Sequence, residues 1–133
     1  MAITYREAVP ADYAEVKQLL TRIGWGKRVE SDDRLARMIH GADRTVVACR
    51  DERVVGFARA LFDGASNGYI STVAVAPDEQ RKGIGRELVK RLMRCDNPDQ
   101  ITWVLRSRAE SRGFWESLGF RASETAMEIV RRE

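Results

Sequence analysis

A glycine-containing loop with clustered basic residues is the segment of this sequence best suited to bind an anion. It follows the apolar run Val73–Ala76 and reads Gln80-Arg-Lys-Gly-Ile-Gly-Arg86, after which apolar residues recur at helical spacing. The first turn of a helix presents unpaired backbone N–H groups and the positive end of the helix dipole. Glycine has no Cβ, so an anion can approach its backbone closely. The segment therefore predicts a phosphate cradle, and the alternative is a glycine-rich turn that binds nothing.

The distribution of charge supports the cradle only weakly. The net charge of +3 is too small to argue for nucleic acid. Between Gln80 and Arg94, however, six basic residues face one acid, Glu87. This local excess suits a small polyanion, whereas the alternative is a solvated helix face.

Other chemistries are poorly supported by the sequence. The loop lacks the Gly-Lys-Ser/Thr of a P-loop, and Leu88 stands where a dinucleotide fingerprint needs its third glycine. His40 is the single histidine and ends a helical pattern, so it favours a C-terminal capping role over a catalytic one. Cys49 and Cys95 form no CxxC motif. We therefore expect no metal site.

Periodicity predicts an alternation of strands and helices around this loop. The predicted order is β-α-α-β-β-β-α-β-α-β, which is a mixed α/β fold with antiparallel hairpins in its middle. We expect strands over 2–8, 45–50, 54–63, 69–76, 101–106 and Ser123–Val130, and helices over 12–23, 31–41, 84–93 and a last segment ending at Leu118.

Length and composition agree with a folded domain. The chain has 133 residues, of which 44% are hydrophobic and 32% charged, so we expect a single domain over residues 1–133. Uninterrupted apolar runs reach only four residues, as in Val73–Ala76, which argues against a membrane span. The first residues contain no apolar signal-peptide region, and we expect a cytoplasmic location.

Two motifs resemble those of the GNAT (GCN5-related) N-acetyltransferase superfamily. Gln80-Arg-Lys-Gly-Ile-Gly85, after a Val-x-Val-x-Pro strand, is similar to that family's pyrophosphate loop. About thirty residues later, Phe114-Trp-Glu-Ser-Leu-Gly-Phe120 resembles its Phe-Tyr-x-x-Leu-Gly-Phe helix. The resemblance covers the whole chain. It implies a mixed six- or seven-stranded sheet with helices on both faces, and a homodimer.

The resemblance also implies a set of contacts to acetyl-CoA, the family's co-substrate. The backbone of Val73, Ala74 and Val75 would bind the pantetheine arm like an added strand. The aromatic pair Phe114 and Trp115 would lie near the pantetheine and the thioester. The pyrophosphate would be held by the loop residues Gln80, Arg81, Lys82, Gly83, Ile84, Gly85 and Arg86.

The proton-transfer groups depart from the family pattern. Trp115 stands where the family usually has a tyrosine acid, and Tyr69 stands where some members have a glutamate base. We therefore consider Asp63, acting through water, as a base, and Tyr69 and Ser71 as proton relays. The alternative for Asp63 is a turn-forming Asp-Gly. Arg108 occupies the place of an asparagine in many relatives.

The amine acceptor is predicted to bind between the 24–30 loop, the 62–69 hairpin and the C-terminal strand. Trp25 and Phe62 would form its wall, although Trp25 equally fits a buried anchor. Asp63, with Glu30, Asp32 and Asp33, would attract a cationic amine, although Asp32 and Asp33 also favour a helix N-terminus. We expect an N-acetyltransferase acting on a small primary amine, with no nucleic acid or membrane partner. The alternatives are a protein N-acetyltransferase and a non-catalytic acyl-CoA sensor.

Overall fold

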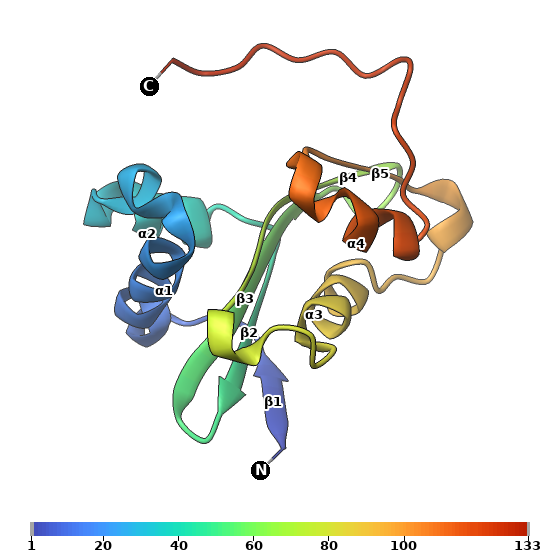
Figure 1. Cartoon of the computed structure of the whole chain (residues 1–133). Coiled ribbons are helices and arrows are strands. Elements are labelled where there is room, and N and C mark those ends of the chain that lie inside the picture. The colour runs from blue at the N-terminus through green and yellow to red at the C-terminus, as the bar shows by residue number, and fades with distance from the viewer. Residues whose placement is uncertain (1, 133) are drawn as a thin grey trace.

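A sheet of five strands separates two layers of helices in the computed structural model, which describes residues 2–132. Helices α1 and α2 cover one face, and α3 and α4 cover the other (Figure 1). This arrangement confirms the predicted fold class with helices on both faces. The elements are β1 (Ile3–Arg6), α1 (Tyr13–Leu20), α2 (Asp32–His40), β2 (Arg44–Arg50), β3 (Arg53–Phe62), β4 (Asn67–Val75), α3 (Ile84–Leu92), β5 (Thr102–Leu105) and α4 (Arg112–Ser117).

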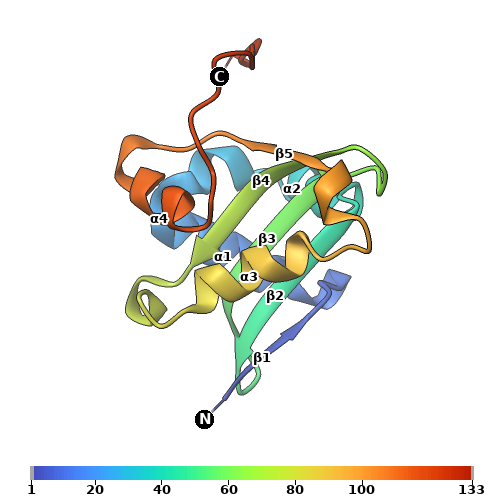
Figure 2. The same cartoon turned by 90° about the vertical axis from the view of Figure 1, so that its right-hand side faces the viewer.

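The strands lie in sequence order, β1-β2-β3-β4-β5. The first three pairings are antiparallel, as the predicted hairpins require. β5 follows α3 and runs parallel to β4, but the pairing covers only residues 67–70 of β4, and it ends where Ile70 faces Leu105. Because β4 continues to Val75, its last five residues have no neighbour on the β5 side (Figure 2).

A bulge interrupts β4 at the same point. Arg59 faces Thr72 and the next residue, Ala60, faces Ile70, so Ser71 is an extra residue with no partner on β3. A bulge bends its strand and increases the local twist. The bulge and the end of the β5 pairing thus coincide, and together they open the sheet between β4 and β5.

Both helical layers pack on the sheet through the apolar faces that the sequence predicts. Val16 and Leu20 of α1 and Leu88 and Leu92 of α3 are fully buried, as is Phe57 of β3 between the layers. Side chains alternate across a strand, so the central strands contribute residues to both cores. The rigid centre of the sheet fixes β4, and with it the open edge described above.

The end of α4 confirms a detailed prediction. Gly119 has a φ of 97°, and its N–H donates to the carbonyl of Glu116 while the N–H of Phe120 donates to the carbonyl of Trp115. These are the two hydrogen bonds of a Schellman motif. The ring of Phe120 meets that of Trp115 edge-on at 5.4 Å. The motif fixes Trp115 against the sheet.

The predicted final strand, Ser123–Val130, is wrong. Residues 121–132 form neither helix nor strand and pass away from α4 as an extended tail (Figure 1). The Ser123 hydroxyl accepts hydrogen bonds from the N–H groups of Thr125 and Ala126, so a local turn takes donors that a strand would need. Met127 and Ile129 are fully exposed. The described sheet therefore has five strands instead of the six or seven expected.

Within residues 2–132 there is no helix of the length and apolarity that crossing a bilayer requires.

Candidate functional site

The gap between β4 and β5 forms a cleft with a free strand edge along one side. The N–H of Ala76 donates to Val55 of β3, and the hydrogen-bonding direction alternates along a strand. The backbone groups of Val73 and Val75 therefore point the other way, toward the β5 side, where the ladder has ended. The cleft thus offers strand hydrogen bonds to an extended ligand.

One end of this cleft, the loop end, lies where β4 meets α3. It encloses about 600 Å³, a size typical of ligand pockets, which run from roughly 300 to 1,000 Å³. The residues that line it are Val73, Val75, Glu79, Gln80, Arg81, Gly83, Ile84, Gly85, Arg86, Glu110, Ser111 and Phe114. All but three of the loop end's residues come from one stretch of chain, as the glycine-loop motif predicts.

The backbone geometry of the loop end is suited to binding an anion. Gly83 precedes α3 with a φ of 86°, and Arg81 adopts a φ of 65°. The first N–H groups of α3 have no acceptor within the helix and face the approach to it. A Cβ on Gly85 would lie 3.3 Å from the ring of Phe114 and 3.8 Å from Val75. Glycine at this position keeps the loop end open.

A buried carboxylate holds the loop in this shape. Glu79 is 3% exposed and accepts hydrogen bonds from Arg50 at 2.6 and 2.8 Å and from Lys82 at 3.2 Å. These bonds, chiefly those from Arg50, lower the pKa of Glu79 to about 2. Lys82, predicted to contact the ligand, is thus tied to Glu79.

Two further polar side chains connect the loop to its surroundings. The side-chain amide of Gln80 donates to the carbonyl of Val75 at 3.1 Å, so that carbonyl is already used and the N–H of Val75 is the group left for a ligand. Arg86 reaches across to the hydroxyl of Ser117 on α4 at 3.3 Å. Both residues remain at the loop end, where the motif predicted them.

The opposite end of the cleft, the tryptophan end, is assembled from several segments. Its wall includes Trp25 from the turn after α1, Ser71 and Thr72 from the bulge, and Trp115 from α4. The guanidinium of Arg108 lies over the ring of Trp25, 5.4 Å from its centre. Val73, Val75, Gln80, Glu110 and Ser111 line both ends, so the cleft is continuous.

Ser71 is the predicted relay residue that the fold places in this cleft. Its hydroxyl oxygen accepts a hydrogen bond from Arg59 at 2.9 Å, and Arg59 also donates to the hydroxyl of Thr72 at 3.2 Å. The serine is therefore held in one orientation at the bulge. Its own hydroxyl proton stays available to water or to a ligand.

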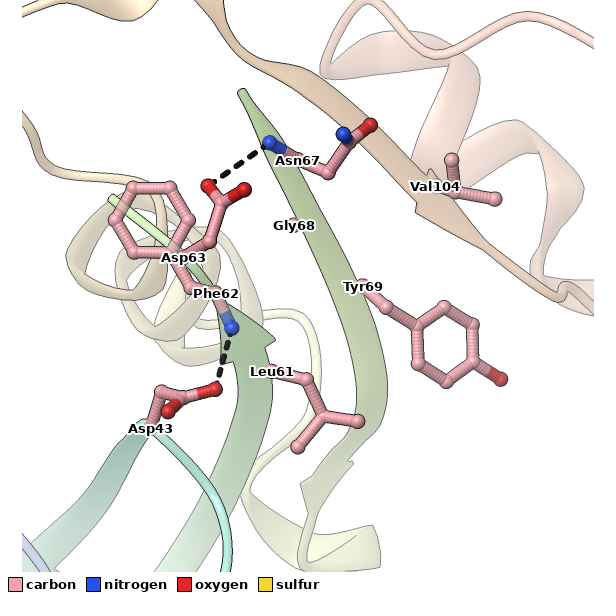
Figure 3. A pocket seen from close by; sticks show the side chains of 8 residues that line it. All are labelled: Asp43, Leu61, Phe62, Asp63, Asn67, Gly68, Tyr69 and Val104. Carbon is pink, nitrogen blue, oxygen red and sulfur yellow. Dashed lines mark hydrogen bonds between the residues drawn. The ribbon is translucent and has the colours of Figure 1, made fainter. Parts of the chain in front are cut away.

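Asp63 and Phe62 lie outside the cleft, in a separate hollow at the far end of β4 (Figure 3). The carboxylate of Asp63 accepts from the N–H groups of residues 65, 66 and 67 and from the hydroxyl of Ser66. These bonds hold the pKa of Asp63 well below its usual range. Asp63 thus serves the turn, the alternative that its Asp-Gly pattern also favoured, and its geometry does not suit a base. Phe62 stacks on Trp103 at 4.9 Å.

Tyr69 also lines that separate hollow, and Figure 3 shows its ring directed away from Asp63. The bulge at Ser71 lies between Tyr69 and the cleft-lining part of β4. If side chains alternated uniformly through β4, Tyr69 would lie on the same face of the sheet as Val73 and Val75. Because Ser71 is an extra residue, the register with β3 places Tyr69 on the opposite face from Val73. Tyr69 does not line the cleft, but it interacts electrostatically with Arg59, which donates to Ser71 at the tryptophan end. Its role as a relay stays a prediction.

The acidic residues expected to attract a cationic amine are likewise elsewhere. Asp32 and Asp33 are in the first turn of α2, and Asp32 pairs with Lys17 at 2.7 Å. The backbone carbonyl of Glu30 accepts a hydrogen bond from the same lysine. None of the three lines the cleft. His40, the last residue of α2, is also outside it.

Comparison with known proteins places this chain in a family. The acetyltransferase (GNAT) domain family matches residues 11–129, so the chain belongs to the GNAT acetyltransferases. It is 32% identical over 123 residues to serotonin N-acetyltransferase 2 of Oryza sativa and 28% identical over 109 residues to an uncharacterized N-acetyltransferase of Pyropia yezoensis. The crystal structure of a Trypanosoma brucei acetyltransferase superposes with a TM-score of 0.76 at 27% identity, covering 98% of this chain and 100% of that one.

The sequence relatives are longer than this chain. The match covers 86% of this chain but 59% of the rice protein, and 80% of this chain but 63% of the Pyropia protein. This chain therefore matches only about three-fifths of the length of these relatives.

Several residues in or beside the cleft were not predicted as functional. Glu79 is an acid beside a basic loop, and nothing in the sequence distinguishes it from the exposed Asp78. In the sequence, Arg59 is a single polar residue within a predicted strand. Its partners Ser71 and Thr72 can be identified only once β3 is paired with β4. Arg106 and Arg108 follow β5, and their position beside Trp25 depends on the packing of distant segments.

Proposed function

We propose that this chain transfers the acetyl group of acetyl-CoA to a primary amine, and that the amine belongs to a small molecule. The observation that carries the proposal is the continuity of the cleft. A free strand edge at Val73 and Val75 leads directly into a helix N-terminus at Gly83. An extended arm that ends in a pyrophosphate needs this combination.

The residues at the loop end fit such a ligand. The first N–H groups of α3 would bind the pyrophosphate oxygens, with the positive charge of Arg81 and Arg86 beside them. Gly85 leaves the space that a Cβ would fill. The backbone of Val73 would hydrogen-bond the amide groups of the arm. Acetyl-CoA, when bound, supplies an acetyl thioester that a neutral amine can attack.

The protein's own groups then act on charge and position. The N–H of Val75 faces the cleft and would stabilise negative charge that develops on the reacting carbonyl oxygen. Ser71, oriented by Arg59, would hold the water that accepts the proton from the amine. Trp115 lines the site, but an indole N–H cannot deliver a proton near neutral pH. As the C–N bond forms and the C–S bond breaks, the sulfur of CoA would therefore leave as a thiolate and take its proton from water. Positioning of two substrates therefore supplies most of the acceleration.

Two observations favour a small acceptor. The tryptophan end encloses about 390 Å³, within the roughly 300–1,000 Å³ range of small-molecule sites. The rice relative is named for the acetylation of serotonin, a small amine.

Two measurements test the proposal. Saturating acetyl-CoA should raise the melting temperature, because a ligand at a hundredfold excess over its Kd stabilises the fold by about 2.7 kcal/mol. Thiol release from acetyl-CoA should then depend on an added amine. Absence of both effects overturns the proposal. Binding without amine-dependent release instead supports an acyl-CoA sensor, and acetylation of peptides but not of free amines supports a protein acetyltransferase.

A further inference from the structure

We propose that the acceptor carries an anionic group, a carboxylate or a phosphate, near its reacting amine. This inference rests on the function proposed above and specifies its substrate class. Two arginines carry it: Arg108 lines the tryptophan end, and Arg59 donates to the hydroxyls of two residues that line it. Neither pairs with a carboxylate among the described residues. The shared chemistry is an anion with several oxygen acceptors.

Arg59 provides the first observation. It is half-buried on β3, and its Nε and Nη2 groups donate to the hydroxyls of Thr72 and Ser71, which line the tryptophan end. A guanidinium has five N–H donors, so most of them remain available. No carboxylate pairs with Arg59 among residues 2–132. Burial is the main cause that lowers the pKa of its guanidinium, Tyr69 partly offsets this effect, and the like charge of Arg131 adds to it.

A half-buried cation without a carboxylate is costly to the fold, because a partly desolvated charge needs compensation. Hydroxyl groups compensate it only in part. A negatively charged ligand at Ser71 and Thr72 would complete its coordination. The placement of Arg59 is therefore easier to explain by binding than by stability.

Arg108 provides the second observation. It is exposed at the mouth of the tryptophan end, with its guanidinium over the ring of Trp25. Within the described part of the chain it forms no ion pair. Stacking on an aromatic ring orients a guanidinium while leaving its edge free to bind oxygen atoms in pairs. Arg108 thus adds a preoriented donor beside the half-buried one.

The acidic groups nearby do not cancel the positive charge of these two arginines. Glu110 is the carboxylate among the described residues that line the tryptophan end. Arg106 lies at the same end and is neutralised by Glu128 of the tail at 2.7 Å. Glu110 is thus the carboxylate that opposes Arg108 at this end, and the interactions of Arg59 with Tyr69 and Arg131 add no carboxylate. The combined charge of Arg59 and Arg108 favours an anion over a second cation.

The indole of Trp25 supplies a further donor at this wall. Its Nε1–H is buried and has no acceptor among residues 2–132. Buried indole N–H groups usually have a hydrogen-bond partner. An oxygen of an anionic acceptor that enters beside the ring would provide one.

Matched pairs of amines test the proposal. Phenylalanine is compared with phenylalaninamide and phosphoethanolamine with ethanolamine, so that each pair differs in its anionic group and the two pairs distinguish carboxylate from phosphate. Binding to the CoA-loaded protein is measured by calorimetry at several pH values, because the paired amines differ in pKa. We expect the anionic member of at least one pair to bind about tenfold more tightly, as for a charge-assisted hydrogen bond.

Variants assign the preference to the arginines. Arg108→Gln and Arg59→Gln should each remove most of the preference, whereas Arg59→Lys should retain part of it. Arg34→Gln, on the exposed surface of α2, is the matched control and should change nothing. Because Arg108 is exposed, its variant tests the proposal even where Arg59→Gln fails to fold.

The outcomes separate this inference from the proposed function. Equal or tighter binding of the uncharged member in both pairs overturns the inference, even if acetylation proceeds. A preference that persists in both glutamine variants also overturns it. A preference for the anionic member that depends on Arg59 and Arg108 supports the inference even if no thiol is released, in which case only the transferase proposal fails.

Discussion

The two ends of the cleft are built in different ways. The loop end comes almost entirely from residues 73–86, one strand, one turn and the start of one helix. The tryptophan end brings together the turn after α1, the bulge of β4, the segment after β5 and α4. A site made by one continuous stretch leaves its pattern in the sequence, whereas a site made by four distant segments does not.

The two ends also differ in how their charges are balanced. At the loop end, the buried carboxylate of Glu79 is fully paired with Arg50 and Lys82. At the tryptophan end, Arg59 and Arg108 have no carboxylate partner among the described residues. The first arrangement stabilises the shape of the loop, and the second leaves guanidinium groups without a carboxylate partner among the described residues.

The largest effect is expected from closing the loop end. Gly85→Val should abolish detectable binding of CoA, because its Cβ would already lie 3.3 Å from Phe114 and its methyl groups would extend into the cleft. Gly83→Val should do the same but adds backbone strain, since Gly83 has a φ of 86°. Calorimetric titration with CoA is the measurement. Gly113→Ala, in α4 with open space around it, is the control and should bind normally. Normal binding by Gly85→Val would show that the loop end is not the cofactor site.

Removing the charge that shapes the loop should have the next largest effect. Glu79→Gln leaves Arg50 and Lys82 without their carboxylate, so the loop loses its fixed geometry. We expect the KM for acetyl-CoA to rise about tenfold to a hundredfold, with kcat nearly unchanged. Glu87→Gln, which breaks the surface pair with Arg91 on α3, is the matched control. Equal KM values for both variants would mean that the ion-pair cluster does not position the loop.

The same carboxylate predicts a pH dependence of stability. The pKa of Glu79 falls from 4.5 to about 2 on folding, so its pairing stabilises the fold above pH 4.5 and is lost as the pH drops toward 2. The melting temperature of the parent should therefore decline over this interval, and more steeply than that of Glu79→Gln. Parallel melting curves for the two proteins between pH 5 and 2 would contradict the assignment.

The chemistry at the tryptophan end should appear in the pH–rate profile. With Trp115 in the place of the acid, we expect the rate to climb with pH as the amine loses its proton, without a falling limb near pH 10. Tyr69→Phe should change the profile only slightly, because Tyr69 lines the separate hollow and is connected to the cleft only through its interaction with Arg59. A sharp alkaline fall that Tyr69→Phe removes would show that this tyrosine acts on the thiolate after all.

Restoring the family residue sharpens that test. Trp115→Tyr should raise kcat if the hydroxyl reaches the sulfur, although Trp115 packs against Phe114 at 5.0 Å and Phe120 at 5.4 Å, and lost packing offsets part of the gain. Trp115→Phe, which replaces the indole by a smaller ring without adding a hydroxyl, is the control. A gain in both variants would mean that the size of the ring, and not an acid, limits the rate.

The smallest effect is expected outside the cleft. Asp63→Asn should change kcat/KM by less than about twofold, as is usual for surface substitutions away from a site. It should lower the melting temperature slightly, because Asp63 accepts hydrogen bonds from three backbone N–H groups of its turn. Steady-state kinetics and a thermal melt measure both. A large loss of activity with an unchanged melting temperature would instead support Asp63 as the general base.

The sequence by itself determined the features that depend on neighbouring residues. The glycine loop, the helix after it and the Schellman end of α4 at Gly119 are local patterns, and each is present where the sequence predicted it. The alternation of the central strands likewise predicted the hairpins of the sheet. Local hydrogen bonds and side-chain spacing decide these features, so a single chain segment carries the information.

Only the tertiary structure decided which side chains meet. One extra residue at Ser71 places Tyr69 and Val73 on different faces, and this depends on the register between β3 and β4. The strand predicted over Ser123–Val130 has the right alternation, but a strand also needs a partner edge, and no described strand pairs with it. Arg108 and Trp25 meet at one cleft through the packing of the segments after α1 and β5 against β4, and Arg59 contacts the cleft residue Ser71 through the pairing of β3 with β4. Contacts between distant segments depend on the free energy of the whole fold, which no local pattern contains.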